Sequence, residues 1–252
     1  MIDIHSHLVY DVDDGSENIE DTIHMLKEAK DAGFTDIILT PHYMEHYYMV
    51  PCFEISKKIE SIREKAQSIG INIYQGNEIY STENIIELIN EKEAMSLNNS
   101  RYVLFELPMQ SRPMNIEQVI YLLLQAGKIP VMAHPERYSY VQKDPNMLLD
   151  YIEQGVLFQS NYGSISGRYG HEIKETVKKL LTHDMIHFLG SDNHRVNTVY
   201  KEIPETLKIL EKWVREDKAE ELTTINPKHI INNEEFEIEE PIEIHKKSWK
   251  FW

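Results

Sequence analysis

One recurring unit constrains how this 252-residue chain can fold: an amphipathic stretch, then a glycine, then a short apolar run. The unit occurs at four junctions, at Gly33, Gly70, Gly127 and Gly155. Glycine favours the left-handed backbone conformation that ends a helix, so each junction predicts a helix followed by a strand. The stretch before Gly70 has helical spacing, with apolar residues in steps of four and three from Ile55 to Ile69.

The predicted strands are almost continuously apolar, which is typical of parallel strands that are buried on both faces. About seven are expected, over residues 2–5, 36–40, 71–76, 102–106, 129–133, 156–160 and 185–190. Such a series of strand–helix units indicates an α/β fold, and its length favours a closed barrel in a single domain. An open doubly wound sheet would need a glycine-rich phosphate loop after its first strand, and none follows residues 2–5.

The charge balance and the cysteine content exclude several classes of partner and site. There are 26 Lys and Arg against 42 Asp and Glu, and the resulting net charge of −16 argues against nucleic acid or an anionic membrane surface as a partner. The single cysteine, Cys52, excludes an intrachain disulfide and a multi-cysteine zinc site. We see no signal peptide and no apolar run of the roughly 18 residues that a membrane span needs, so we expect a cytoplasmic protein without membrane insertion.

The last segment of the chain differs in composition from the rest. Residues 233–252 are first acidic and then basic and aromatic, and they are expected to form a tail appended to a barrel built by residues 1–232. The sequence leaves open whether this tail forms an edge strand or a docked arm.

Histidines and carboxylates follow nearly all of the predicted strands, and the active sites of βα barrels lie at this end of the strands. The residues at these ends include His5, His7, Asp14, His42, Glu78, Glu106, His134, Asp192 and His194, together with Asp11, Asp13 and Glu136. In a strand, residues two apart point to the same side, so His5 and His7 can face one metal ion. Imidazole and carboxylate ligands suit Mn, Fe or Zn, and about nine donors exceed what one ion needs, so two or three ions are expected.

Other phosphoryl-transfer and hydrolase motifs are absent. A cysteine phosphatase loop would require an arginine at the position of Lys58, six residues after Cys52. The pair Asp11 and Asp13 is followed by Gly15, where an aspartyl-phosphate phosphatase motif has threonine or valine. We find neither a P-loop nor a G-x-S-x-G nucleophile elbow.

The motifs MIDIHSH, DDG, TPH, GNE, LFELP, AHPERY and SDNH, in this order, resemble the PHP (polymerase and histidinol phosphatase) superfamily. The segments DVDDGS and HPERY are similar to its CpsB/CapC-type branch, the manganese-dependent protein-tyrosine phosphatases of capsule and exopolysaccharide systems. The resemblance covers residues 1–232 and implies a distorted (β/α)7 barrel, TIM-like in shape, with two or three metal ions, most simply Mn²⁺.

The resemblance also implies how the ligands are shared. His5, His7, Glu78 and Asp192 would hold one ion, and Glu78 would bridge to a second ion that Glu106 and His134 complete. A third ion would be held by Asp14, His42 and His194. A hydroxide between two of the ions would then attack the phosphorus.

Two arginines are the candidate phosphate contacts. Arg137, in HPERY, matches the phosphate-binding arginine of the branch, whereas the branch usually has its second arginine several residues beyond the SDNH motif. Here Arg195 follows that motif directly, so either Arg195 replaces the second arginine from a different position or the second phosphate contact is missing. The resemblance implies as substrate and partner the tyrosine-rich, phosphorylated tail of a bacterial tyrosine kinase, and the aromatic loop after His42 would either line the entrance for its ring or pack on the barrel.

Three other functions compete with this interpretation. One is a small-molecule phosphatase of the same superfamily that acts on a histidinol-phosphate-like substrate. Another is a metal-dependent phosphoesterase or nuclease, against which the net charge of −16 argues. The third is a non-catalytic scaffold, against which the complete set of ligand residues argues.

Overall fold

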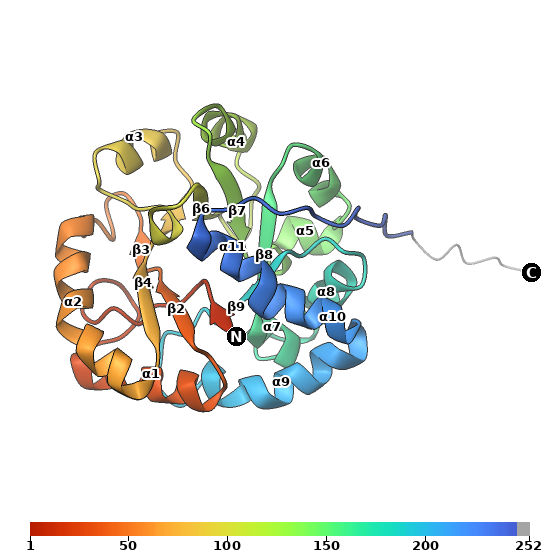
Figure 1. Cartoon of the computed structure of the whole chain (residues 1–252). Coiled ribbons are helices and arrows are strands. Elements are labelled where there is room, and N and C mark those ends of the chain that lie inside the picture. Colours follow the sequence, from red (N-terminus) through yellow and green to blue (C-terminus); the bar gives the residue numbers. More distant parts are fainter. Residues whose placement is uncertain (246–252) are drawn as a thin grey trace, which may run out of the picture.

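The computed structural model describes residues 1–245, in which parallel strands curl around a common axis inside a ring of helices (Figure 1). The strands are β1 (Ile2–Asp3), β2 (Asp36–Leu39), β3 (His42–Tyr43), β4 (Asn72–Gln75), β5 (Glu78–Tyr80), β6 (Tyr102–Glu106), β7 (Ile129–Ala133), β8 (Leu157–Asn161) and β9 (Phe188–Gly190). The predicted α/β fold, a distorted seven-stranded barrel in one domain, is confirmed, with two of the seven strands each divided in two.

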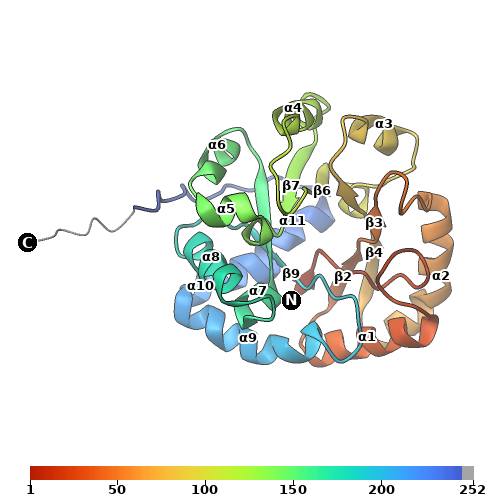
Figure 2. The same ribbon diagram turned by 180° about the vertical axis from the view of Figure 1, so that it is seen from behind.

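Helices follow most of the strands and cover the outside of the barrel (Figures 1 and 2). They are α1 (Ile19–Asp31), α2 (Cys52–Ile69), α3 (Ile85–Asn90), α4 (Ile116–Gln125), α5 (Ser139–Lys143), α6 (Met147–Glu153), α7 (Tyr162–Ser166), α8 (His171–Leu181), α9 (Val199–Trp213), α10 (Glu216–Glu220) and α11 (Asn226–Asn232). Short helical turns lie at η1 (Leu97–Asn99), η2 (Pro135–Arg137) and η3 (Glu221–Ile225). Within residues 1–245, none of the helices has the length and apolar character required to cross a bilayer.

Two breaks in the chain explain why the sheet is distorted. Strands β1, β2 and β4 form one parallel sheet, and β3, β5, β6, β7, β8 and β9 form a second. The chain leaves the first sheet at Pro41, which has no backbone N–H for a ladder, and resumes pairing as β3. The neighbouring break lies at Asn77, whose side-chain amide donates a hydrogen bond to the Pro41 carbonyl at 3.0 Å. Beyond the strands, a parallel bridge between Ser6 and Asn193 joins the first segment of the barrel to the last.

The glycine junctions end helices as expected. Gly70 caps α2 with φ 87°, and its N–H bonds to the carbonyls of Ala66 and Gln67. Gly33, Gly127 and Gly155 also have positive φ. Each of these glycines lets the chain turn from the outer layer of helices back into a strand.

The apolar residues form an outer and an inner core. The outer core packs the helices on the strands, and the smaller inner core fills the barrel. On β6, Tyr102 and Leu104 belong to the inner core, and Glu106, two residues further along the same face, is nearly buried at the carboxyl end. The interior of the barrel is therefore apolar up to the layer in which the polar residues begin.

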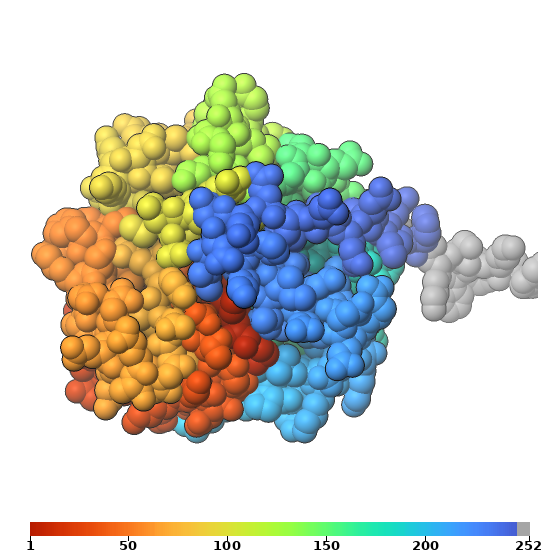
Figure 3. All heavy atoms as spheres, in the orientation of Figure 1, coloured from red at the N-terminus to blue at the C-terminus, as the bar shows by residue number. Residues whose placement is uncertain are grey.

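The C-terminal strap, residues 233–245, runs from α11 across the face seen in Figures 1 and 3, and it begins beside Tyr102, the first residue of β6. It contains no strand, and hydrogen bonds and ion pairs hold it along its length, among them those of Arg101 with Glu235 and of Lys218 with Glu239. The hydroxyl of Tyr102 bonds to the Glu234 carbonyl, Ile242 N–H donates to the His183 carbonyl at 2.9 Å, and Ile244 N–H donates to Asn146 Oδ1 at 2.9 Å. The rest of the predicted tail, residues 246–252, lies outside the described residues.

Candidate metal centre

All nine predicted ligand residues lie at one end of the barrel, where the strands end and the loops begin. His5 and His7 follow β1, and His134 follows β7 directly. His42 and Glu78 open β3 and β5, immediately after the two breaks in the sheet, so the breaks place both side chains at the barrel mouth. The remaining members of the set are Asp14 in the loop before α1, Glu106 at the end of β6, and Asp192 and His194 after β9.

The side chains form three overlapping groups whose donor atoms lie within 4.8 Å of one another. These groups are His7, Asp14, His42 and His194; His5, His7 and Asp192; and His42, Glu78 and Glu106. His134 adjoins the third group, with its Nε2 at 3.0 Å from Glu78 Oε1 and 3.8 Å from Glu106 Oε2. The structure therefore brings all nine residues together, and it shares His7 and His42 between groups that the resemblance had kept separate.

Glu78 occupies the centre of the cluster and is fully buried. Its Oε2 lies 3.2 Å from His5 Nε2, 3.4 Å from His7 Nε2 and 3.0 Å from His42 Nδ1. Burial raises its pKa, but the neighbouring His5 and His42 outweigh this effect and hold the pKa well below the usual value. A carboxylate that is charged and buried at the meeting point of several histidines has the position of a bridging ligand.

The hydrogen bonding of the cluster fits bound cations. The buried atoms Glu78 Oε2 and His42 Nδ1 have no hydrogen-bond partner, although they face each other. Burial and the nearby charge of Glu78 raise the pKa of Glu106, so the two neighbouring carboxyl groups do not both ionise readily when no cation is bound. Unpaired buried donors and acceptors are rare in proteins, and divalent cations bound by imidazole and carboxylate groups would satisfy these.

Residues behind the ligands orient the imidazole rings. His7 Nδ1 lies 2.8 Å from Asp13 Oδ2, and His5 Nδ1 lies 2.7 Å from Gln159 Oε1. Each contact fixes a ring so that its Nε2 points into the cluster, which is how partners behind metal-binding histidines commonly act. Asp13 and Gln159 were not predicted as site residues, although Asp13 lies beside Asp14 and Gln159 lies on a predicted strand.

Gly15 is required by close packing around His7. A Cβ atom on Gly15 would lie 2.2 Å from the His7 carbonyl oxygen and 2.6 Å from the His7 Cβ. No side chain fits in this space, so the third residue of the DDG motif has to be glycine for the loop to approach the first strand.

The two predicted arginines have different surroundings. Arg137 Nη1 donates to Asp192 Oδ2 at 2.8 Å, and its guanidinium lies 4.9 Å from the ring centre of Tyr169. Its side chain keeps 28% of its surface exposed at the edge of the cluster. Arg195 instead directs Nη1 at the carbonyl oxygens of Asp14 and Gly15, and at that of its neighbour in the chain. Tyr169 was not predicted, and no spacing or motif in the sequence indicates that it lies beneath Arg137.

The aromatic loop after His42 divides between the entrance and the barrel. Tyr48 stacks on His42, with ring centres 5.8 Å apart and planes 15° apart. Tyr47 and Phe53 are exposed, whereas Tyr43 is buried in the outer core. Tyr43 therefore packs on the barrel, and Tyr48 lies against a candidate metal ligand.

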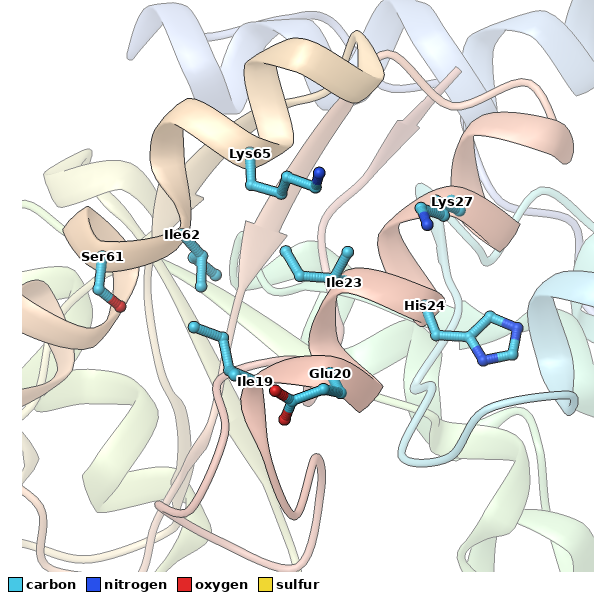
Figure 4. A pocket seen from close by; sticks show the side chains of 8 residues that line it. All are labelled: Ile19, Glu20, Ile23, His24, Lys27, Ser61, Ile62 and Lys65. Atoms are coloured by element: carbon cyan, nitrogen blue, oxygen red, sulfur yellow. The ribbon is translucent and has the colours of Figure 1, made fainter.

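A groove of about 600 Å³ lies elsewhere on the surface, between α1 and α2 (Figure 4). Ile19, Ile23 and Ile62 line it together with polar side chains of the same two helices. All of its lining residues come from the outer layer, so the groove is separate from the cluster at the barrel mouth.

The fold is a distorted parallel barrel, and the cluster lies at the carboxyl ends of its strands. These two features place the protein in the class of PHP-type barrels with a candidate metal centre. The chain belongs to the CpsB/CapC family, because residues 1–232 match the family model described as "Capsular polysaccharide synthesis, CpsB/CapC".

Individual relatives agree with this family. The chain is 35% identical over 198 residues to a CapC protein of Staphylococcus aureus, with 78% of each chain covered. It is 32% identical over 238 residues to the tyrosine-protein phosphatase CpsB of Streptococcus pneumoniae, covering 92% of this chain and 98% of CpsB. A crystal structure from work on Bacillus subtilis YwqE and S. pneumoniae CpsB, described as unique metal-dependent tyrosine phosphatases, matches 98% of this chain and 100% of its own, with a TM-score of 0.87 and 30% identity.

Proposed function

We propose that this chain is a metal-dependent protein-tyrosine phosphatase that dephosphorylates the tyrosine-rich tail of a bacterial tyrosine kinase controlling capsule or exopolysaccharide synthesis. The observation that carries the proposal is the contact between Arg137 and Asp192, which holds a guanidinium group at the edge of the cluster of nine candidate ligands. The names of the relatives CpsB and YwqE, each 32% identical to this chain, support phosphotyrosine as the substrate.

We propose Mn²⁺ as the metal, with Fe or Zn as the alternatives that the same donors suit. His5, His7, Glu78 and Asp192 would hold one ion, Glu78, Glu106 and His134 a second, and Asp14, His42 and His194 a third. The short distances from Glu78 to the surrounding histidines support a bridging role for this carboxylate. Bound divalent cations would supply positive charge to the phosphoryl oxygens and lower the pKa of water at the site.

Arg137 has the geometry to bind the phosphoryl group from the side of the cluster. Its contact with Asp192 leaves other guanidinium N–H groups for phosphate oxygens, and these donors match phosphate in two-point contacts. The same charge offsets the negative charge that develops during in-line displacement. A tyrosyl leaving group, with a solution pKa of about 10, departs with little help from a general acid, whereas a serine alkoxide would need a strong one.

The entrance of the site favours an aromatic substrate. Tyr48 stacks on His42 at the cluster, and its neighbour Tyr47 is exposed. A phosphotyrosine ring that reaches the cluster would pass these side chains and pack against them.

The remaining parts of the proposal concern the whole chain. We propose that residues 1–232 form the catalytic barrel, that residues 233–252 are an appended tail, and that the protein acts in the cytoplasm. The end of the family match at residue 232 supports this boundary.

Two other hydrolytic functions remain as alternatives. A histidinol phosphate phosphatase from Lactococcus lactis shares the fold, with a TM-score of 0.55 at 12% identity, so a small-molecule phosphomonoester is the main competing substrate. A nuclease would have to bring a polyanion to a chain with a net charge of −16.

Steady-state assays test the proposal directly. With Mn²⁺, Fe²⁺ or Zn²⁺ added, hydrolysis of a phosphotyrosyl peptide is expected to exceed hydrolysis of histidinol phosphate, and metal analysis of the purified protein identifies the resident ion. His5→Ala and His134→Ala should abolish activity, while His171→Ala, at an exposed histidine at the start of α8, should not. Near-normal activity of either cluster variant in the presence of metal would refute the assignment.

A further inference from the structure

The acidic loop, residues 10–17, has an unusual charge for a segment that must fold tightly. It carries the carboxylates of Asp11, Asp13, Asp14 and Glu17, and it closes on itself through Asp11 N–H, which donates to the Ser16 carbonyl at 2.8 Å. Asp11 adopts a left-handed backbone conformation with φ 52°, which residues other than glycine seldom adopt. Charge repulsion and this backbone conformation both oppose the folded loop, so other groups have to stabilise it.

The loop delivers two carboxylates to the candidate metal centre. Asp13 is buried, and its Oδ2 accepts from His7 Nδ1 at 2.8 Å and from the His42 N–H at 2.9 Å. Asp14 places Oδ1 3.6 Å from His42 Nε2 and 3.4 Å from His194 Nε2. The group formed by His7, Asp14, His42 and His194 therefore depends on the position of this loop.

Two cationic side chains hold the loop from different elements. From α2, Lys58 directs Nζ at the carbonyl oxygens of Tyr10 and Asp11, at 3.2 and 3.1 Å, and at the Asp11 carboxylate at 3.3 Å. From the segment after β9, Arg195 directs Nη1 at the carbonyl oxygens of Asp14 and Gly15. The first half of the loop is thus bound by Lys58 and the second half by Arg195.

We propose that Lys58 and Arg195 are positioning residues, which clamp the acidic loop so that Asp14 completes the metal position shared with His7, His42 and His194 while Asp13 orients the His7 ring. Arg195 then acts on the backbone of the loop and does not contact phosphate. The inference rests on the metal centre of the proposed function, and it does not depend on which phosphate ester is the substrate.

Metal binding provides the first test, because loss of groups behind a metal ligand typically lowers metal affinity by about 10- to 100-fold. The chelator-treated full chain is titrated with Mn²⁺ while free Mn²⁺ is followed by electron paramagnetic resonance. Arg195→Met and Lys58→Met should each weaken one class of bound Mn²⁺ by about tenfold and leave the others unchanged, and Arg195→Lys should recover part of the loss.

Matched controls keep the change in net charge the same. Lys57→Met removes the neighbour of Lys58 on α2, and Lys201→Met removes a cation that is 54% exposed, compared with 51% for Arg195. Both control variants should bind Mn²⁺ as the unaltered chain does. Arg195→Gln, which keeps a donor but no charge, serves as a second variant, and circular dichroism establishes that each protein is folded.

Phosphate binding separates the clamp from a direct phosphate contact. Inorganic phosphate is titrated by calorimetry into the Mn²⁺-saturated proteins, so the measurement needs no phosphatase activity. Arg195→Met should bind phosphate within about twofold of the unaltered chain, whereas Arg137→Met should lose about tenfold or more. Unchanged Mn²⁺ binding in both Lys58→Met and Arg195→Met would overturn the clamp, as would a tenfold loss of phosphate affinity in Arg195→Met at unchanged Mn²⁺ affinity.

Discussion

Arg137 Nη1 lies 2.8 Å from Asp192 Oδ2, and Asp192 in turn has its Oδ1 3.4 Å from His7 Nε2 and 3.6 Å from His5 Nε2. The carboxylate therefore binds the arginine through one oxygen and faces the histidines with the other. If Arg137 binds phosphate and the histidines bind metal, as we propose, Asp192 would couple the two, so a change at either partner should affect a defined part of the site.

Replacement of Arg137 is expected to impair substrate turnover more than metal binding. Arg137→Met should lower kcat/KM for a phosphotyrosyl peptide by about 100- to 1000-fold, the range found when one donor to the developing charge is lost. Arg137→Lys should recover only part of the activity, because lysine lacks the planar pair of donors. Steady-state kinetics at saturating Mn²⁺ measure both, with Arg215→Met, at an exposed ion pair with Asp217, as the control. A kcat/KM within fivefold of the unaltered chain would contradict the assigned role.

The ring of Tyr169 is expected to position Arg137. Tyr169→Leu removes a cation–π contact worth about 1 kcal/mol, which should raise KM about fivefold at nearly constant kcat. Tyr169→Phe keeps the aromatic face and should behave as the unaltered chain. Equal losses in the two variants would assign the effect to the Tyr169 hydroxyl instead of the ring.

Gly15→Ala is expected to disrupt the packing of the acidic loop against His7. The added Cβ has no space beside the His7 carbonyl, so the loop must shift, at a cost of about 2 kcal/mol in the free energy of unfolding. Urea denaturation of the metal-free chain measures this loss. Gly127→Ala is the comparison, because the space around that residue is open although its φ of 69° adds backbone strain. If Gly15→Ala is no less stable than the unaltered chain, the packing argument is wrong.

Removal of metal is expected to lower the stability of the barrel. Without cations, burial and the charge of Glu78 raise the pKa of Glu106 to about 8, so Glu106 holds a proton near neutral pH in the place where a cation would bind. Mn²⁺ at one hundred times its dissociation constant should add about 2.7 kcal/mol to the free energy of unfolding for each site filled. Thermal melts with a chelator and with added Mn²⁺ test this, and identical melting temperatures would contradict it.

His187 is expected to make stability depend on pH. It is 4% exposed, its Nδ1 accepts from the Phe158 N–H, and burial together with nearby Lys218 lowers its pKa to about 3. The unfolded chain takes up a proton at this residue below about pH 6.5 and the folded chain does not, so stability falls as the pH decreases from 6.5 towards 3. Between pH 7.5 and 5.0 this residue should account for about 2 kcal/mol.

A variant isolates that contribution from the other titrating groups. His187→Asn keeps an acceptor for the Phe158 N–H but has no proton to bind in this range. Urea denaturation of chelator-treated protein at the two pH values should show a smaller loss for the variant by about 2 kcal/mol. The same pH dependence in both proteins would show that His187 titrates normally in the folded chain.

Local chemistry made much of this molecule predictable. Glycines that end helices and apolar runs that suit buried parallel strands indicated the seven strands. The histidines and carboxylates at the strand ends indicated where the cluster lies, and the resemblance to the family motifs selected its nine members. The breaks at Pro41 and Asn77 could not be predicted, because a divided strand depends on how its neighbours pair and not on its own residues alone.

The residues missed at the site have a similar explanation. Asp13 contacts His7, and Tyr169 contacts Arg137. The two members of each pair lie in loops that come together only when the barrel folds. Arg195 was predicted as a phosphate contact because it follows the SDNH motif. Its hydrogen bonds to the carbonyl oxygens of Asp14 and Gly15 in the acidic loop depend on the folded structure and could not be predicted from the sequence.

The C-terminal strap also bears on how the chain assembles during synthesis. The ribosome releases the chain from its N-terminus, so residues 233–245 emerge after every strand and helix to which they bind. Until then the hydroxyl of Tyr102 lacks the Glu234 carbonyl, and the ring of Phe188 lacks its neighbour Phe236. A nascent chain that stalls before the strap is therefore expected to leave the apolar rings of Tyr102 and Phe188 accessible to chaperones, and synthesis of residues 233–245 supplies the segment that covers them.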